Sequence, residues 1–250
     1  MRDFSYQLYS SRKFPPLADT LAMLGNLGYS QVEGFGGLYG PGADVGALRA
    51  GLDENGLSMP TAHFGLPTVR DTPDEVIATA KALGIKVVLV PHIAAPDRPA
   101  DAAGWAAFGR ELVEAGKPIR DAGFAYGWHN HEFEFTDLGG DDLPLDLMLG
   151  DNDLALELDL AWVEVGGQSA VDYINKYADR IVSVHLKDIA PEGECLDEDG
   201  WADVGFGIMD WPAIMAAVDK SSAQYLVMEH DNPNDHQRFA SRSLSAAKEF

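Results

Sequence analysis

The sequence is poor in cysteine, in basic residues and in long apolar stretches. Its single cysteine, Cys195, cannot form an internal disulfide, which fits a reducing compartment such as the cytoplasm. No uninterrupted apolar stretch is long enough to span a bilayer, and the first residues, MRDFSYQLYSSRKF, lack the apolar segment of a secretory signal. We therefore expect a cytoplasmic protein with no membrane partner.

The shortage of basic residues gives the chain a formal net charge of -22, from 18 Lys and Arg against 40 Asp and Glu. Contacts to nucleic-acid phosphates need clustered lysine and arginine, so no nucleic-acid partner is expected. The acidity is instead typical of a well-solvated surface. With 46% hydrophobic residues over 250 positions, the chain has enough apolar side chains for a sizeable core.

A unit of helix, glycine and strand recurs along the chain. Gly28-Tyr29, Gly56-Leu57 and Gly84-Ile85 follow one another at intervals of 28 residues, and Gly123-Phe124 repeats the pattern at a longer interval. Each glycine follows a stretch with helical periodicity and precedes a short apolar run. Glycine just past a helix end accepts the left-handed conformation that ends the helix.

Eight short runs are expected as strands: residues 4–9, 31–35, 58–64, 87–92, 124–130, 154–159, 181–186 and 225–230. Helical segments follow them, among them 17–27, 73–83, 101–121, 143–149, 169–178, 210–219 and 236–248. Strict alternation of strand and helix predicts a parallel sheet, and eight such units predict a single (β/α)8 TIM barrel over residues 1–250. The main alternative, an open doubly wound sheet, would usually carry a glycine-rich phosphate loop after an early strand, and the sequence has none.

Residues of metal-ligand type stand at the ends of the last four expected strands. One residue from each gives the set His129, Asp159, His185 and Glu229. The carboxyl ends of parallel strands meet at one rim of a barrel, so these side chains are expected to converge. Two imidazoles and two carboxylates suit a divalent ion such as Mn²⁺, Zn²⁺, Fe²⁺, Co²⁺ or Mg²⁺. Each residue alone is more often hydrogen-bonded scaffolding, but burying all four without a cation would be costly.

Side-chain alternation divides the stretch WHNHEFEF, residues 128–135, between two faces. His129 and His131 point the same way, whereas Glu132 and Glu134 have the opposite parity unless the chain bends after the strand. The stretch is therefore expected to supply only a part of the site.

Four further residues are weaker candidates. His63 and His92 end the third and fourth expected strands, and we expect them either at the mouth of a pocket or in plain surface or supporting roles. Trp201 and Phe206 lie in the longest irregular stretch, residues 191–209, and either cover a substrate or anchor the loop.

Six segments carry a resemblance to a known family. They are QLYSSR, GWHNHEFEF, LELDLAWVEVGG, VHLKD, VGFGIMDWPAI and VMEHDNP, in this order along the chain. With them the sequence resembles the sugar phosphate isomerase/epimerase family, the xylose isomerase-like TIM barrels. The resemblance covers most of the chain. It implies a small-molecule sugar substrate without naming the sugar, because the family is functionally broad.

The resemblance also implies one divalent metal ion, held by a carboxylate, an aspartate, a histidine and a glutamate from strands five to eight. The last three correspond to Asp159, His185 and Glu229. The first departs from the pattern, because many relatives have Glu-Asn-His where this chain has His129-Asn130-His131. Either His129 binds the metal or a neighbouring carboxylate replaces it. The candidates for that carboxylate are Glu132, Glu134 and Glu157.

The activity implied is that of a metal-dependent isomerase or epimerase on a keto-sugar or sugar derivative, through a metal-stabilised enediolate. Glu229 is the expected proton-transfer group, and His131, Glu157 and Lys187 are expected to orient the substrate or move protons.

Other functions stay open from the sequence. Loss of a leaving group from the same intermediate would make the protein a lyase or dehydratase on a keto-inositol or 3-keto-glycoside. A non-catalytic sugar-binding barrel is a further alternative, and the net charge argues against an endonuclease IV-like phosphodiesterase. Barrels of this kind often associate, so a homo-oligomer is also open.

Overall fold

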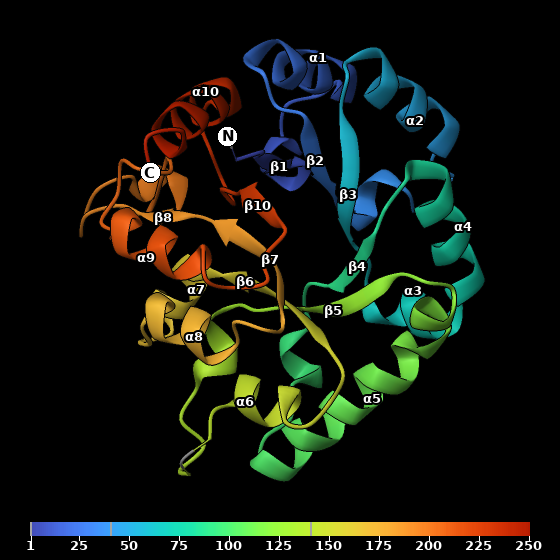
Figure 1. The fold of residues 1–250 in the computed structure, drawn as a ribbon, viewed down its shortest axis with the longest axis vertical. Coiled ribbons are helices and arrows are strands. Elements are labelled where there is room, and N and C mark those ends of the chain that lie inside the picture. Colours follow the sequence, from blue (N-terminus) through green and yellow to red (C-terminus); the bar gives the residue numbers. More distant parts are fainter. Residues whose placement is uncertain (1, 41, 141) are drawn as a thin grey trace.

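A computed structural model describes residues 2–40, 42–140 and 142–250. Eight parallel strands close into a barrel in the order β1-β10-β7-β6-β5-β4-β3-β2, which confirms the predicted (β/α)8 fold (Figure 1). The strands are β1 (Ser5–Gln7), β2 (Gln31–Gly34), β3 (Ser58–His63), β4 (Val87–Val90), β5 (Ala125–His129), β6 (Ala155–Asp159), β7 (Ile181–Leu186) and β10 (Tyr225–Met228). Each coincides with one of the eight runs expected from the sequence.

Helices surround the barrel (Figure 1). They are α1 (Leu17–Leu27), α2 (Val45–Glu54), α3 (Leu66–Asp71), α4 (Pro73–Leu83), α5 (Ala102–Asp121), α6 (Pro144–Leu149), α7 (Leu160–Val165), α8 (Ala170–Lys176), α9 (Trp211–Val218) and α10 (His236–Ala247). Short α3 and α7 go beyond the sequence-based expectation, as does a small hairpin of β8 (Asp188–Ile189) and β9 (Trp201–Ala202). Within the described ranges, no helix has both the length and the apolar content to cross a membrane.

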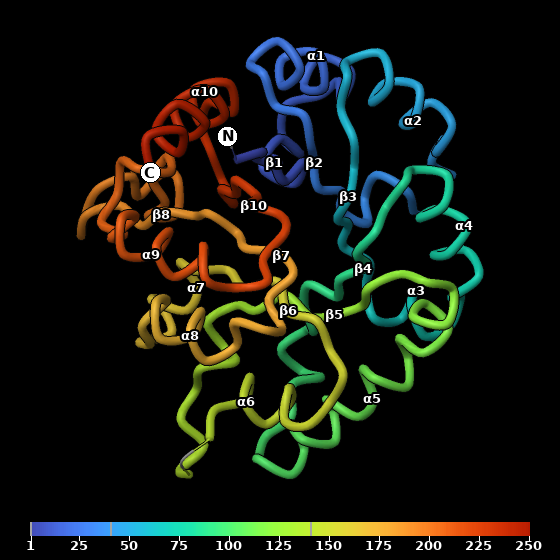
Figure 2. The backbone as a smooth tube through the Cα atoms, in the orientation of Figure 1, coloured from blue at the N-terminus to red at the C-terminus, as the bar shows by residue number. Residues whose placement is uncertain are grey.

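The two ends of the chain meet where the barrel closes. Strand β1 pairs with β2 on one side and with β10 on the other. The Arg2 guanidinium donates a hydrogen bond of 2.8 Å to the Phe250 carbonyl. Helices α1 and α10 consequently lie side by side in the outer ring (Figure 2).

The recurring glycines have the backbone conformation that the sequence predicts. Gly28 (φ 94) ends α1 and Gly84 (φ 78) ends α4, both in the left-handed region. Gly56 (φ 67) and Gly123 (φ 92) take the same conformation just after α2 and α5. The helix–glycine–strand unit is therefore confirmed.

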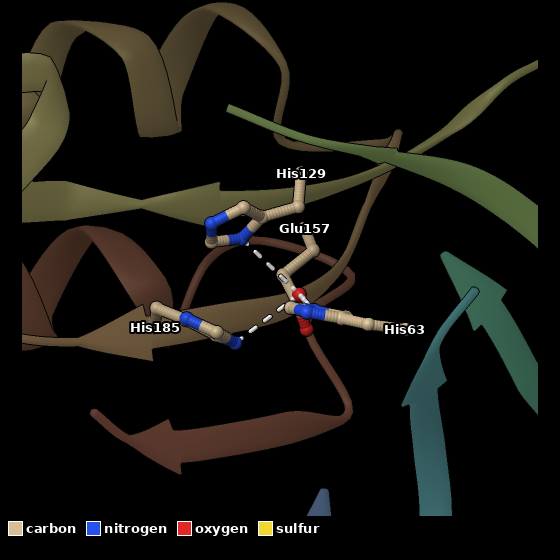
Figure 3. Close-up of side chains that lie close together, drawn as sticks. All are labelled: His63, His129, Glu157 and His185. Carbon is tan, nitrogen blue, oxygen red and sulfur yellow. Dashed lines mark hydrogen bonds and ion pairs between the residues drawn. The ribbon is translucent and has the colours of Figure 1, made fainter. Parts of the chain in front are cut away.

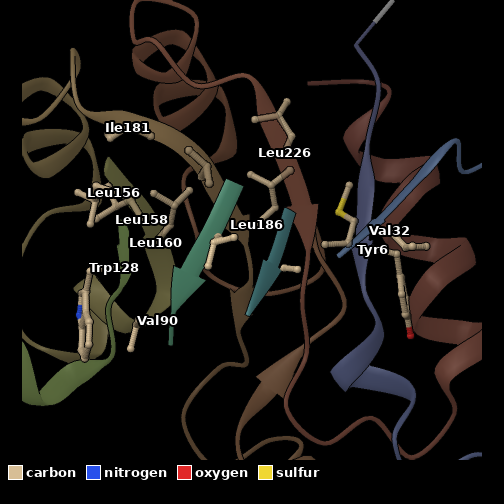
Figure 4. Close-up of a cluster of buried hydrophobic side chains, with 14 of the residues drawn as sticks. Tyr6, Val32, Val90, Trp128, Leu156, Leu158, Leu160, Ile181, Leu186 and Leu226 are labelled. Carbon is tan, nitrogen blue, oxygen red and sulfur yellow. The ribbon is translucent and has the colours of Figure 1, made fainter. Parts of the chain in front are cut away.

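Strand alternation separates apolar from polar side chains. On β6, Leu156 and Leu158 are buried in the apolar layer beside Trp128 of β5 (Figure 4). Glu157 and Asp159 have the opposite parity, and both are also fully buried. Their carboxylates therefore face the barrel axis and not the helix layer.

Apolar side chains commonly fill the interior of a TIM barrel. The interior of this barrel is more polar. Ser5, Gln7, Glu33, Thr61 and Ser183 are all fully buried on the inner strands. A hydrogen bond of 2.7 Å joins Gln7 Nε2 to Glu33 Oε1. Polar side chains therefore extend from the carboxyl ends of the strands into the interior of the barrel.

Candidate metal-binding site

Four buried side chains converge at the carboxyl ends of β5, β6, β7 and β10. His129, Asp159, His185 and Glu229, here called the rim set, each offer a ligand atom, and these atoms lie within 4.8 Å of one another. The register of β6 and β7 places Asp159 directly beside His185. The structure thus brings together the four residues that the sequence selected, one from each strand.

A second group of ligand-type atoms overlaps with the first. His63, His129, Glu157 and His185, here called the His63 set, also lie within 4.8 Å of one another. Figure 3 shows the three imidazoles gathered about the Glu157 carboxylate. Glu157 Oε2 lies 2.6 Å from His63 Nε2, 3.1 Å from His185 Nε2 and 3.2 Å from His129 Nδ1. The Glu157 carboxylate is therefore already in contact with nitrogen atoms on three sides.

Glu33 of β2 is a site residue that the sequence reasoning missed. Its Oε1 lies 2.7 Å from His185 Nε2 and 3.1 Å from His63 Nε2. Because β2 and β7 are not neighbours in the barrel, the contact with His185 crosses the barrel interior. The sequence did contain a signal for this residue. Glu33 is a charged residue within the short strand QVEGF, and a charged side chain in a buried strand usually has a partner.

The two ring nitrogens of His185 face different carboxylates. Nδ1 lies 2.7 Å from Glu229 Oε2 and 3.8 Å from Asp159 Oδ2, on the side of the rim set. Nε2 faces Glu33. Burial would lower the pKa of His185, but the surrounding carboxylates, Glu157 first, outweigh it and raise the pKa well above its ordinary value. Both ring nitrogens therefore carry a proton, and Nδ1–H donates to Glu229. A divalent ion at the rim set would take the place of the Nδ1 proton, while Nε2–H would still donate to Glu33. A carboxylate behind a histidine in this way fixes both the tautomer and the orientation of the ring.

Asp159 has one oxygen that the protein does not satisfy. Its Oδ1 accepts a 2.9 Å hydrogen bond from Trp162 N, while Oδ2 has no hydrogen-bond partner among the described residues. Burial raises the pKa of Asp159 to about 8, and the nearby Glu229 carboxylate adds to this while Lys187 opposes it. A buried carboxylate oxygen without a partner is costly, and a cation would remove that cost.

Glu229 and Glu157 are ionised. Burial alone would raise the pKa of Glu229, but His185 and Lys187 outweigh it and hold the pKa well below its ordinary value. For Glu157, His185 and His63 likewise outweigh burial and lower the pKa. Both groups therefore carry a negative charge at neutral pH.

Lys187 is a fixed positive charge beside the rim set. Its ammonium lies 4.5 Å from the Trp162 ring centre and 4.2 Å from that of Trp201, and it forms an ion pair with Asp231. It is also 3.9 Å from Glu229 Oε2. Burial would lower the pKa of Lys187, but the surrounding carboxylates, Asp231 first, raise it above its ordinary value. Lys187 therefore remains protonated at neutral pH.

The stretch after β5 brings His131, but not its glutamates, to the cluster. The His131 and His129 rings lie 5.0 Å apart, as their shared parity predicts. Glu134 is buried elsewhere, where it accepts hydrogen bonds of 2.7 Å from Trp128 Nε1 and 2.9 Å from His131 N. Glu132 lines the cavity but joins neither set. The expectation that Glu132 or Glu134 replaces His129 therefore finds no support in the geometry, because Glu134 is held by Trp128.

A cavity of about 520 Å³ opens above the cluster. Rim-set residues His129 and Glu229 line it, together with His63, His92 and His131. His92 thus lies at the mouth, as one of its two readings predicts. Burial and the Arg98 guanidinium lower the pKa of His92.

Trp201 and Phe206 do not line this cavity. Trp201 packs against Trp162, with ring centres 4.7 Å apart, and covers Lys187. Phe206 is half exposed and lies under the Arg242 guanidinium. The aromatic residues of the loop thus support charged side chains and do not cover the cavity.

A single carboxylate organises the loop between β7 and α9. Asp188 is fully buried and accepts hydrogen bonds from the backbone N–H groups of Gly205, Gly207 and Met209, at 2.9, 3.1 and 3.2 Å, and from Trp211 Nε1 at 2.8 Å. A Cβ at Gly207 would come within 2.2 Å of this carboxylate. Gly207 is therefore required by the approach of the loop to Asp188. Gly205 is required for another reason, because its φ of 86 is left-handed and an added Cβ would lie 2.6 Å from the Ala246 Cβ.

Replacing Asp188 with alanine is expected to lower the free energy of unfolding by about 3 kcal/mol, because several buried donors lose a charged acceptor. Urea denaturation measures the loss, and limited proteolysis of residues 191–209 reports the loop. Asp210→Ala is the control, since Asp210 is exposed and caps α9 through one 3.2 Å bond to Ala213 N. It should lose about 1 kcal/mol. Equal losses in the two variants would contradict the role assigned to Asp188.

Comparisons with known proteins agree with this architecture. The model of the xylose isomerase-like TIM barrel family matches residues 24–249. No curated protein sequence matches the chain. A sugar phosphate isomerase/epimerase from Parabacteroides distasonis ATCC 8503 has a similar structure, with 19% identity, a TM-score of 0.81, and coverage of 98% of this chain and 94% of that one.

Two further solved structures have the same fold. The probable 3-DHS dehydratase AsbF from Bacillus anthracis, involved in petrobactin synthesis, has 11% identity and a TM-score of 0.77, covering 98% of both chains. The IOLI protein, solved with a zinc atom bound, has 15% identity and a TM-score of 0.73, covering 99% of this chain and 95% of that one. At these identities the structures establish the fold alone.

Proposed function

Because this chain belongs to the xylose isomerase-like TIM barrel family, we propose that it is a metal-dependent isomerase or epimerase that enolises a keto-sugar or a sugar derivative. The observation that carries the proposal is the buried rim set of two imidazoles and two carboxylates, which borders a cavity of about 520 Å³. A cavity of this size suits a small polar molecule.

The rim set is the group proposed to hold the divalent ion. Its two nitrogen and two oxygen donors suit Zn²⁺, Mn²⁺, Fe²⁺ or Co²⁺. Each set contains one carboxylate oxygen without a hydrogen-bond partner among the described residues, Asp159 Oδ2 in the rim set and Glu157 Oε1 in the His63 set. The rim set is favoured because it has two carboxylates to balance the charge of a divalent ion, whereas the His63 set has one. In the His63 set the Glu157 carboxylate is already in contact with three imidazoles. A divalent ion bound by the rim set would supply Lewis-acid polarisation of a substrate carbonyl.

Glu229 is the proposed proton-transfer residue. Its carboxylate lines the cavity, is ionised, and can accept a proton from the carbon next to a substrate carbonyl. Lys187, 3.9 Å away, keeps its positive charge and would offset negative charge that develops on the substrate. Glu157 does not line the cavity, so its proposed role is to position His63, His129 and His185 and not to transfer protons.

His131 supports the second candidate function, a lyase or dehydratase. It lines the cavity, and burial followed by the charges of His129 and Lys187 lowers its pKa well below the ordinary value. A neutral imidazole on the cavity wall can exchange a proton with a departing hydroxyl or sugar oxygen. The first step, removal of the proton by Glu229, is common to both functions.

Solvent deuterium exchange tests that shared first step. We expect NMR to show deuterium uptake next to the carbonyl of at least one compound from a panel of keto-sugars, keto-inositols and 3-keto-glycosides. EDTA should stop the uptake and Mn²⁺ should restore it. A protein that carries one divalent ion per chain and exchanges no compound of the panel would overturn the proposal and favour a sugar-binding barrel.

A further inference from the structure

A second hollow adjoins the cavity above the rim set. Its volume is about 560 Å³, against about 520 Å³ for the cavity itself. Gly36, just after β2, and Gly65, just after β3, line both spaces. We call this second space, enclosed between residues 36–40 and the segment 64–79, the outer hollow. The function proposed above uses only the cavity and leaves the outer hollow without a role.

The outer hollow has one aromatic wall and one hydroxyl-bearing wall. The rings of Tyr39 and Phe64 stack with their centres 4.5 Å apart, and the Tyr39 hydroxyl donates a 2.6 Å hydrogen bond to the His63 carbonyl, which fixes its ring. Thr68, Thr72 and Thr79 lie on the side formed by α3 and α4. A polar edge can therefore meet the threonines while an apolar face packs on the rings.

The charge of the lining limits what can bind there. Glu75 is the one charged residue among the described residues that line the outer hollow, which include no lysine, arginine or histidine. A phosphate or carboxylate group would meet no positive partner and would be repelled by Glu75. A neutral group with hydroxyls on its rim and C–H groups on its face meets both walls favourably, and a sugar ring has this character.

We propose that the outer hollow binds the second ring of a two-ring glycoside whose keto ring occupies the cavity. The inference rests on the function proposed above and deepens it, because it makes the substrate a disaccharide-type compound and not a monosaccharide or a sugar phosphate. The linkage between the rings lies at Gly36 and Gly65, where the two spaces meet.

Gly36 keeps the connection open. A Cβ built on Gly36 meets no atom within 4 Å, and its φ lies outside the left-handed region, so the backbone there does not require glycine. Because Gly36 lines both the cavity and the outer hollow, a side chain at this position would occupy space where the two meet. The absence of a side chain at Gly36 thus matters for the width of the passage and not for folding.

The test compares binding of 3-keto-glucose with that of 3-keto-cellobiose and 3-keto-maltose to the metal-loaded protein. We expect calorimetry to give the better two-ring compound a Kd at least tenfold lower than that of 3-keto-glucose. Saturation-transfer difference NMR, with the diamagnetic Zn²⁺ form, should show contact between the protein and the second ring. A two-ring compound that binds no tighter, with no saturation on its second ring, overturns the inference.

Two variants test whether the second ring binds in the outer hollow. Thr79→Trp fills the hollow from α4, and Gly36→Val narrows the passage between the two spaces. Each variant should therefore reduce the two-ring advantage, which is the Kd of 3-keto-glucose divided by that of the two-ring compound, to less than threefold. Ala78→Trp is the matched control, because Ala78 is the exposed neighbour of Thr79 on the same helix. It should keep the tenfold advantage. An advantage that survives both Thr79→Trp and Gly36→Val overturns the inference.

The two proposals fail in different ways. Deuterium exchange of 3-keto-glucose without any two-ring advantage would overturn the second-ring site and support the proposed reaction. Tight binding of a two-ring compound that Thr79→Trp abolishes, with no exchange in any compound, would support the second-ring site and overturn the reaction. Absence of both binding and exchange would overturn both.

Discussion

Replacing Glu229 with glutamine is expected to slow deuterium exchange into a responsive keto-sugar by about 10²–10⁴-fold, the usual loss when a positioned proton-transfer group is removed. Glutamine keeps the shape of the side chain but cannot accept a proton. The carboxylate that it replaces lines the cavity and is 5% exposed, and its Oε2 lies 2.7 Å from His185 Nδ1. The exchange rate is measured at saturating Mn²⁺, and the number of metal ions bound per chain is determined for each variant. A loss of proton transfer is then distinguished from a loss of bound metal.

Glu132→Gln is the matched control for this prediction. Glu132 lines the same cavity but joins neither ligand set, so its variant should lose less than about tenfold. A larger loss in Glu132→Gln than in Glu229→Gln would return Glu132 to the catalytic role and contradict the assignment of Glu229. The same measurement therefore decides between Glu229 and Glu132. The third carboxylate that lines the cavity, Asp231, forms an ion pair with Lys187.

The rim set could be predicted from the sequence because each member ends a strand that is recognisable on its own. In a parallel barrel all carboxyl ends share one rim, so finding the strand ends is enough to bring His129, Asp159, His185 and Glu229 together. Parity along β5 also placed His131 beside His129 correctly. Neither step requires knowledge of which strands face one another across the barrel.

The inner part of the cluster could not be predicted in this way. Glu33 meets His185, and His63 meets Glu157, across the barrel interior, and such pairs depend on the shear and tilt of the closed barrel. The position of the Glu134 side chain could not be predicted either. It depends on a short 3₁₀ turn after β5, which directs the Glu134 carboxylate to Trp128. Parity arguments hold as far as His131, where the backbone is still extended, and end at the turn that begins with Glu132.

Replacing Glu33 with glutamine is expected to weaken binding of the divalent ion by about 10–100-fold, or about 1.4 to 2.8 kcal/mol, although Glu33 belongs to neither ligand set. Glu33 holds the His185 Nε2–H at 2.7 Å and is itself held by Gln7. Glutamine can offer its NH₂ group to Nε2 as readily as its oxygen, so His185 loses its fixed tautomer. Competition with a fluorescent chelator measures the metal affinity.

Ser183→Ala is the control for Glu33→Gln, because Ser183 is equally buried on the inner strands and its hydroxyl has no hydrogen-bond partner among the described residues. It should bind the ion as tightly as the wild type. His63→Gln then distinguishes the two ligand sets. If the ion lies in the rim set, His63→Gln should weaken binding less than Asp159→Asn does, since His63 only supports Glu157. A larger loss in His63→Gln than in Asp159→Asn would move the ion to the His63 set, because there His63 itself would be a ligand and Asp159 would not.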